Sequence, residues 1–275
     1  MKVAKALAET TERLAAAGCE SPRVDAEILV AHLLGTARSE LVIEPSRQLS
    51  RDERDALETI VARREAREPL AYVLGEWDFR RLTLRVDERV LVPRPETEVV
   101  VERCLGRIAA LPAPRVLDVG TGSGAIALAI ADEHAGARVT AVDASAGALE
   151  VARANVVATG LDVELREWDL FFGLPEGPWD LVVSNPPYVL PEELGTLEPE
   201  VREWEPRQAL VGVGATEAVA RGALDALGAG AALVLEVAAG DSPRVAAMLE
   251  ELGYVEVATT QDLAGHDRVV EATRP

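Results

Sequence analysis

The chain has 275 residues, of which 48% are hydrophobic, and a formal net charge of −19 at pH 7. This apolar content is typical of a globular protein and excludes a disordered chain. Its apolar runs are too short and interrupted to span a membrane. The acidic balance disfavours non-specific binding to nucleic acid, which depends on neutralising phosphates.

Residues 1–70 are predicted to form a small helical domain. Three segments carry apolar residues at the three- and four-residue spacing of a helix: Val3 to Ala17, Pro22 to Leu34 and Ser50 to Arg67. Ser50 followed by Glu53 is typical of a helix start, and Gly18 and Gly35 of helix ends. The first segment has charges at helical spacing and no apolar core, so we interpret it as an amphipathic helix and not a signal peptide. The basic cluster at residues 63–67 is mixed with acids and predicts a solvated helix face.

The spacing of the apolar residues changes between Tyr72 and Asp87. Phe79, Leu82 and Leu84 partly alternate with charged residues, which predicts a short antiparallel hairpin. We expect residues 71–90 to form a hairpin linker between the helical domain and the rest of the chain.

Residues 91–275 alternate between strand and helix patterns. The predicted strands are Arg115–Val119, Ala137–Val142, Asp162–Glu167, Trp179–Ser184, Ala231–Val237, Tyr254–Thr259 and Asp267–Ala272. The predicted helices are Glu96–Ala110, Gly124–Glu133, Ala146–Thr159, Ala215–Leu227 and Pro243–Leu252. Such alternation predicts an α/β fold with a mostly parallel sheet covered on both faces. The loop between the last two strands is too short for a helical crossover, so these strands should pair antiparallel.

Cysteine and histidine are scarce in this chain. Cys19 and Cys104 have no second sulfur or histidine at ligand spacing, so neither a metal site nor a disulfide framework is predicted. A reducing cytoplasm is therefore the expected location. The scattered histidines, His32, His134 and His266, are interpreted as surface or capping residues.

A glycine-rich turn follows the first strand of the alternating region. Gly120-Thr121-Gly122-Ser123-Gly124 lies between that strand and an apolar helix, and the next strand ends at Asp143. Glycines let a ligand approach the backbone, the helix start offers free N–H groups, and a carboxylate at Asp143 suits the two hydroxyls of a ribose. The combination predicts a nucleoside-cofactor site.

Two further carboxylates bear on the choice of cofactor. Asp118 precedes the glycine turn and Asp169 follows the third strand, and carboxylates lining the pocket disfavour a pyrophosphate. They suit a cationic ligand with an amino group, a ribose and an adenine. We therefore predict S-adenosyl-L-methionine, with S-adenosyl-L-homocysteine as product, over a dinucleotide.

The stretch Ser184-Asn185-Pro186-Pro187-Tyr188-Val189 ends the fourth strand of this region. Open α/β sheets bind ligands at the carboxyl ends of their strands. The side-chain oxygen of Asn185 and the carbonyl of Pro186 can accept the two hydrogens of a planar NH2 group, with Tyr188 as a flat wall. Holding that nitrogen in line with a methyl group and its sulfur would promote transfer by orientation, without a strong base.

These motifs resemble those of the release factor glutamine methyltransferase family, known as PrmC or HemK, over nearly the whole chain. The segments that carry the resemblance are SPRVDAEILVAHLLG, REPLAYVLGEWDF, VLVPRPETE, VLDVGTGSGAIALA, SNPPYV and DLAGHDRVV. The resemblance implies a seven-stranded, Rossmann-like methyltransferase domain over residues 91–275. It also implies methylation of the side-chain amide nitrogen of the glutamine in the Gly-Gly-Gln loop of class-1 peptide chain release factors, the expected protein partners.

The resemblance assigns roles to matching positions. Residues 120–124, Asp143 and Asn185 would hold the cofactor, Asp169 or Leu170 would face its adenine, and residues 185–188 would grip the glutamine. Arg94 and Thr97 would lie near the site, and Trp168 would either stack on the adenine or pack locally. The chain departs from the family pattern at Gly212 to Glu217 and at His266, outside the core motifs.

Three other functions agree less well with the sequence. An amino-group methyltransferase acting on a DNA or RNA base would share the Asn-Pro-Pro-Tyr chemistry, but the net charge and the lack of a basic patch oppose it. A non-enzymatic nucleoside-binding domain leaves this motif unexplained, and an NAD-dependent oxidoreductase conflicts with the acidic pocket. The helical domain carries no catalytic motif, so we expect it to dock the protein substrate.

Overall fold

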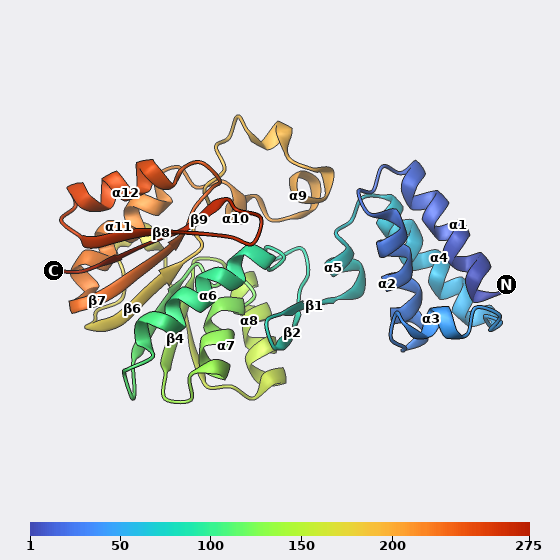
Figure 1. Ribbon diagram of the computed structural model, residues 1–275, viewed down its shortest axis with the longest axis horizontal. Coiled ribbons are helices and arrows are strands. Elements are labelled where there is room, and N and C mark those ends of the chain that lie inside the picture. Colours follow the sequence, from blue (N-terminus) through green and yellow to red (C-terminus); the bar gives the residue numbers. More distant parts are fainter. The chain divides into compact units, whose positions relative to one another are not determined.

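The computed structural model describes residues 1–275, and the chain divides into two compact units (Figure 1). The helical unit comprises Met1–Gly75 and the later segment Glu198–Trp204. The sheet unit comprises Glu76–Leu197 and Glu205–Pro275. None of the helices combines the length and apolar character needed to cross a membrane.

In the helical unit, the helices of the first 75 residues pack around one apolar core that includes Leu14, Leu29 and Val61. Its helices are α1 (Val3–Ala16), α2 (Pro22–Leu34), α3 (Glu40–Ile43), α4 (Arg51–Glu65), α5 (Leu70–Leu74) and α9 (Pro199–Trp204). A capping box formed by Ser50 and Glu53 starts α4, as the sequence indicated. The solvated face predicted at residues 63–67 is wrong for Arg64, which is 5% exposed because it forms ion pairs inside the unit.

The sheet unit contains a seven-stranded sheet with the order β5-β4-β3-β6-β7-β9-β8. Its strands are β3 (Arg115–Val119), β4 (Arg138–Asp143), β5 (Val163–Glu167), β6 (Trp179–Ser184), β7 (Leu227–Glu236), β8 (Val255–Gln261) and β9 (Asp267–Thr273). Pairing is parallel from β5 to β7, while β9 runs antiparallel to both β7 and β8. The predicted mostly parallel sheet with a final antiparallel hairpin is confirmed.

Two apolar cores cover the two faces of this sheet. One core includes Val116 of β3 and packs α6 (Pro95–Ile108) and α7 (Ala125–Glu133), with α8 (Ala146–Thr159) at its edge. The other includes the next residue of β3, Leu117, and packs α11 (Ala215–Ala226) and α12 (Ser242–Glu251). Successive side chains of a strand point to opposite faces, so continuously apolar strands require helices on both sides.

Short elements that the sequence pattern did not reveal complete the sheet unit. They are the 3-10 turns η1 (Leu170–Phe172) and η2 (Leu194–Thr196) and the helix α10 (Arg207–Leu210). They are too short for an apolar period to be recognised.

The predicted hairpin is present as β1 (Glu76–Phe79) and β2 (Leu82–Arg85), but it begins later than expected. Tyr72 lies in α5, which ends at Gly75 in a left-handed conformation. The hairpin belongs to the sheet unit, where buried Asn155 of α8 accepts a hydrogen bond from the Arg85 amide at 2.7 Å. The Asn155 amide also donates to the Ser123 carbonyl at 2.8 Å, which connects the hairpin to the glycine turn.

Candidate active site

The glycine turn and the Asn-Pro-Pro-Tyr segment follow neighbouring strands. Val119 of β3 pairs with Ser184 of β6, and the Ser184 hydroxyl donates to the Val119 carbonyl at 2.7 Å. The chain runs outward from β3 through β4 to β5 and then crosses back to β6, so these strands flank the point where strand order reverses. Ligands bind at such switch points in open α/β sheets.

A cavity of about 350 Å³ opens at this point. That volume is within the range of small-molecule sites. The predicted residues that line it are Arg94, Thr97, Gly120, Thr121, Gly122, Ser123, Asp143, Trp168, Asp169, Leu170, Asn185 and Pro187. The predicted residues that do not line it are Asp118, Gly124, Pro186 and Tyr188.

The glycine turn exposes its backbone to the cavity. Gly120 and Gly122 have φ values of 76° and 57°, which disfavour residues with a Cβ atom. A Cβ atom added at either position would meet no protein atom within 4 Å, so the missing side chains leave open space beside the backbone. The turn is attached to β4, because the amides of Gly120 and Thr121 donate to the Val142 carbonyl at 2.8 and 3.0 Å.

Asp143 lies at the end of β4 and lines the cavity. Its carboxylate accepts hydrogen bonds from the Gly122 and Ser145 amides, both at 2.9 Å. Burial raises the pKa of Asp143, and the backbone hydrogen bonds oppose that effect. An ionised carboxylate has about four acceptor positions, so Asp143 retains capacity for hydroxyl donors.

Asp118 does not contribute to the cavity wall, contrary to the prediction. It is fully buried, and the Thr121 hydroxyl donates to its Oδ2 atom at 2.6 Å while Oδ1 has no hydrogen-bond partner. Burial raises the pKa of Asp118 to about 7, against the opposing hydrogen bond from Thr121. Asp118 therefore supports the turn from within the protein, and the acidic character of the wall comes from Asp143 and Asp169.

The residues after β5 are fixed by local hydrogen bonds. Asp169 accepts from the Phe171 amide at 2.9 Å and thereby caps η1. The Trp168 indole donates to the Gly173 carbonyl at 2.8 Å, and the side chain is 37% exposed. Phe171, which sequence reasoning missed, also lines the cavity and is 61% exposed.

Asn185 is half-buried at the edge of the cavity, and no hydrogen bond within the protein engages its side-chain amide. A second segment lies against this motif: Val189 donates to the Leu210 carbonyl at 2.9 Å, and Gly212 packs against Pro187. A Cβ atom at Gly212 would lie 2.4 Å from the Pro187 ring. The departure at residues 212–217 therefore touches the motif, although the two are separate in the sequence.

Two buried glutamates behind the cavity were not predicted as site residues. Arg94 donates to both carboxylate oxygens of Glu205 at 2.7 and 2.8 Å, and burial raises the pKa of Glu205. The Thr97 hydroxyl donates to Oε2 of Glu236 at 2.7 Å, while Oε1 of that residue has no hydrogen-bond partner. The signal that could have identified Glu236 is a carboxylate at the end of the apolar run of β7.

Known proteins resemble the chain over both units. Residues 5–75 match the PrmC N-terminal domain, and residues 100–197 match the methyltransferase small domain. The release factor glutamine methyltransferase of Rhodopirellula baltica is 42% identical, over 98% of this chain and 95% of the relative. That of Deinococcus radiodurans is 39% identical, over 100% and 99%. The chain belongs to the release factor glutamine methyltransferase family.

The family membership confirms the resemblance inferred from the motifs and establishes the chain as a methyltransferase. Among solved structures, the T. thermophilus 16S rRNA N2 methyltransferase RsmC, in complex with AdoMet and guanosine, has a TM-score of 0.54 and 18% identity. The match covers 73% of this chain and 50% of that chain. This likeness concerns the fold alone.

Proposed function

We propose that this protein transfers a methyl group from S-adenosyl-L-methionine to the side-chain amide nitrogen of the glutamine in the Gly-Gly-Gln loop of class-1 release factors. The observation that carries the proposal is the Asn185 amide, which has no hydrogen bond within the protein and lies at the edge of a cavity shared with Asp143. The names of the relatives supply the acceptor class.

The residues around the cavity fit the proposed cofactor. Asp143 has acceptor capacity for ribose hydroxyls, the open backbone at Gly120 and Gly122 admits close approach, and Asp169 adds negative charge near a cationic ligand. When bound, S-adenosyl-L-methionine would supply an electrophilic methyl group on a sulfonium. No group of three or more His, Cys, Asp or Glu side chains is arranged to hold a metal ion, and the proposed transfer requires none.

The Asn185 side-chain oxygen and the Pro186 carbonyl would accept the two hydrogens of the glutamine amide. The ring of Tyr188 would form a wall beside the glutamine side chain. Burial raises the pKa of Tyr188 to about 12, so its phenol stays protonated at neutral pH and acts as a wall and a donor. Catalysis would then rest on orientation of the acceptor nitrogen. Pro186 and Tyr188 lie outside the cavity lining, which fits an acceptor that enters beside the cofactor.

The helical unit is the proposed docking surface for the release factor. It contains none of the residues that line the cavity, yet its residues 5–75 match the PrmC N-terminal domain. A protein acceptor needs contacts beyond one glutamine, and this unit has no other assigned work.

The proposal is tested by incubating the enzyme with labelled S-adenosylmethionine and, side by side, a purified class-1 release factor or total RNA or DNA. The position of the label is then determined. We expect one methyl group on the Gly-Gly-Gln glutamine, none when that residue is glutamate, and a loss of orders of magnitude in turnover with Asn185→Ala. Glutamate removes both amide hydrogens and adds negative charge. Label on a base amine with none on the glutamine would support the nucleic-acid alternative and overturn this proposal.

A further inference from the structure

The chain leaves the sheet unit shortly after Asn185–Tyr188 and returns to it at Glu205. The intervening segment Glu198–Trp204, which contains α9, belongs to the helical unit. Val189 precedes this segment in the chain, and residues 208–212, which include wall residues of the cavity, follow it. Val189 pairs with Val211, so the two flanks of the segment lie side by side. Whatever holds Glu198–Trp204 therefore acts on both flanks, and the second flank packs against Pro187 of the Asn-Pro-Pro-Tyr motif.

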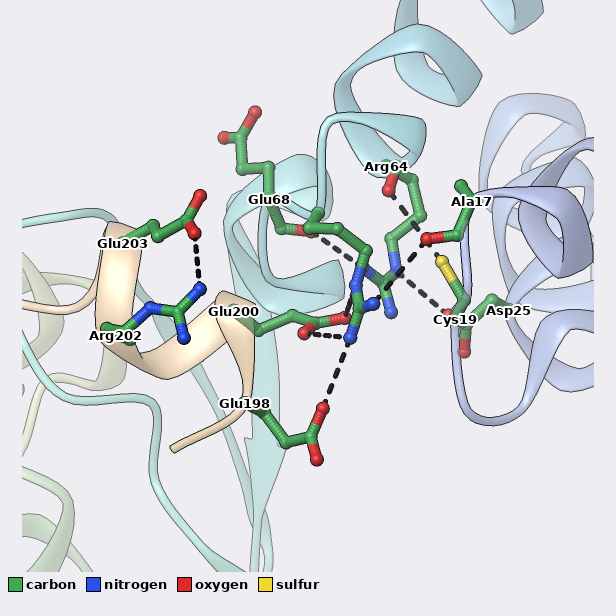
Figure 2. Close-up of polar contacts among 10 residues, drawn as sticks. Ala17, Cys19, Asp25, Arg64, Glu68, Glu198, Glu200, Arg202 and Glu203 are labelled. Atoms are coloured by element: carbon green, nitrogen blue, oxygen red, sulfur yellow. Dashed lines mark hydrogen bonds and ion pairs between the residues drawn. The ribbon is translucent and has the colours of Figure 1, made fainter. Parts of the chain in front are cut away.

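Glu200 makes the shorter ion pairs between this segment and the rest of the helical unit (Figure 2). Its Oε1 atom lies 2.8 Å from Nη1 of Arg64 and 2.7 Å from Nε of Arg67. Its Oε2 atom lies 2.5 Å from Nη2 of Arg67, which gives a bidentate pair. Such paired hydrogen bonds fix direction as well as distance. Arg67 also reaches Glu198 at 3.3 Å.

Arg64 is itself anchored to other parts of the helical unit. Nε of Arg64 donates to Asp25 of α2 at 2.8 Å, and Nη1 contacts the Glu68 carbonyl at 3.3 Å. Arg64 and Asp25 are 5% and 8% exposed. A buried guanidinium needs its charge balanced. Asp25 and Glu200, together with the more exposed Glu198, supply the negative charge that compensates Arg64 and Arg67.

Apolar burial does not explain the place of α9. None of its residues is buried, whereas the Glu200 side chain is 17% exposed. The other ion pair of α9, Arg202 with Glu203, joins side chains that are 38% and 54% exposed. Exposed pairs of that kind contribute little. Burial acts to raise the pKa of Glu200, but the hydrogen bonds from Arg67 and Arg64 outweigh it and lower that pKa, so the residue is charged.

We propose that Glu200 is a positioning residue for the acceptor: its ion pairs with Arg64 and Arg67 hold Glu198–Trp204 on the helical unit and thereby fix residues 189–197 and 205–212. The expected effect of Glu200 on methyl transfer rests on the proposed function, whereas its expected effect on the position of the segment does not. The residue touches neither substrate nor cofactor. Its loss should loosen the acceptor side of the site and leave the cofactor side intact.

The test compares Glu200→Ala with Glu203→Ala in the full chain, because Glu203 lies in the same helix and has only the exposed pair. For Glu200→Ala we expect amide hydrogen exchange in residues 189–212 to be about tenfold faster or more, with β3 and β4 unchanged. The kcat/KM for a release factor should fall by about tenfold, as for loss of a charge-assisted pair, while the Kd for S-adenosylmethionine stays within about threefold. Glu203→Ala should match the wild type.

Arg67→Ala and the double variant Arg67→Ala/Glu200→Ala complete a cycle. If Glu200 acts through Arg67, the double variant should be little worse than the more affected single variant. Arg67→Ala also serves as the test if Glu200→Ala does not fold, since it leaves Arg64 paired with Asp25. The same local exchange and kinetic changes are expected for it.

Equal exchange and kinetics in Glu200→Ala and Glu203→Ala would overturn the proposal. So would a parallel loss of cofactor affinity, which would indicate general damage to the fold. If the wild-type protein methylates no release factor, the proposed function fails, but the exchange comparison still decides whether Glu200 holds the segment.

Discussion

Asp143 and Asn185 differ in how far the protein itself satisfies their side chains. The Asp143 carboxylate accepts two backbone hydrogen bonds, from Gly122 and Ser145, whereas the Asn185 amide makes none within the protein. Asp143 therefore shapes the glycine turn as well as offering acceptors to a ligand. The sequence predicted both residues from their positions at strand ends, but not this difference in capacity.

Asp143→Ala should weaken binding of S-adenosylmethionine by roughly tenfold to a hundredfold, because charge-assisted hydrogen bonds contribute about 1.5–3 kcal/mol. Isothermal titration calorimetry measures the change. Glu167→Ala is the matched control, since Glu167 ends the neighbouring strand β5, is exposed and does not line the cavity. Equal affinity of Asp143→Ala and the wild type would exclude the ribose assignment.

Glu236 makes the stability of the sheet unit depend on pH. Burial raises its pKa to about 7 from 4.5, against the hydrogen bond from Thr97. The native state therefore retains a proton that the unfolded state releases. The contribution of Glu236 to the free energy of unfolding is fully present below about pH 4.5 and is lost as the pH rises to about 7. The loss is roughly 3 kcal/mol, at 1.36 kcal/mol per pKa unit.

Glu236→Gln should remove this loss, because glutamine mimics the protonated acid. In urea unfolding, we expect the variant to match the wild type near pH 4.5 and to be more stable by up to roughly 3 kcal/mol at pH 8. Asp118, whose pKa is also about 7, acts in the same direction and is unchanged in both proteins. A stability difference that does not vary with pH would contradict the assignment.

At the scale of elements, the site depends on how the segment after α10 packs against the end of β6. A Cβ atom at Gly212 would lie 2.6 Å from the Pro187 carbonyl oxygen and 2.4 Å from its ring. Neither the ring nor the backbone can rotate away. The wall at residues 208–212 and the Asn-Pro-Pro-Tyr motif are therefore one packed structure.

Gly212→Ala should displace Pro187 and lower kcat/KM for the protein acceptor by about tenfold or more, with a stability cost of roughly 1–3 kcal/mol typical of overpacking. Steady-state kinetics and urea unfolding measure the two effects. Gly195→Ala is the control, because a Cβ atom there meets no atom within 4 Å and its φ is not positive. The packing argument fails if both variants behave alike.

At the scale of the whole molecule, the helical unit is not a simple N-terminal extension. A chain that begins at Glu76 would also remove Arg64 and Arg67, the partners of Glu200. We expect it to bind S-adenosylmethionine within a few-fold of the full chain, because the cavity residues lie in the sheet unit. Its activity on a release factor should be lost, as calorimetry and methyl transfer assays would reveal.

Full activity of the shortened chain would refute both the docking role and the positioning role. Glu200→Ala in the full chain separates the two, because it retains the rest of the helical unit. A loss much larger on truncation than in Glu200→Ala would assign the difference to docking.

Sequence patterns predicted the seven strands and five long helices of the sheet unit, the final antiparallel hairpin and the two motifs of the candidate site. These features are local. The spacing of apolar residues, the glycine turns and the residues directly after each strand can each be recognised within a short stretch of sequence. The glycine turn and Asn185 were predictable because parallel strands bring their carboxyl ends to one edge.

The residues that pack against these motifs follow only from the tertiary structure. Asp118 was expected on the wall but is buried beneath the turn, because burial depends on how α7 covers β3. Arg64 appeared solvated, yet it pairs with Asp25 and Glu200, which are 39 and 136 residues away in the sequence. Contacts of this kind depend on which distant segments the fold brings together, and no local window of sequence contains that information.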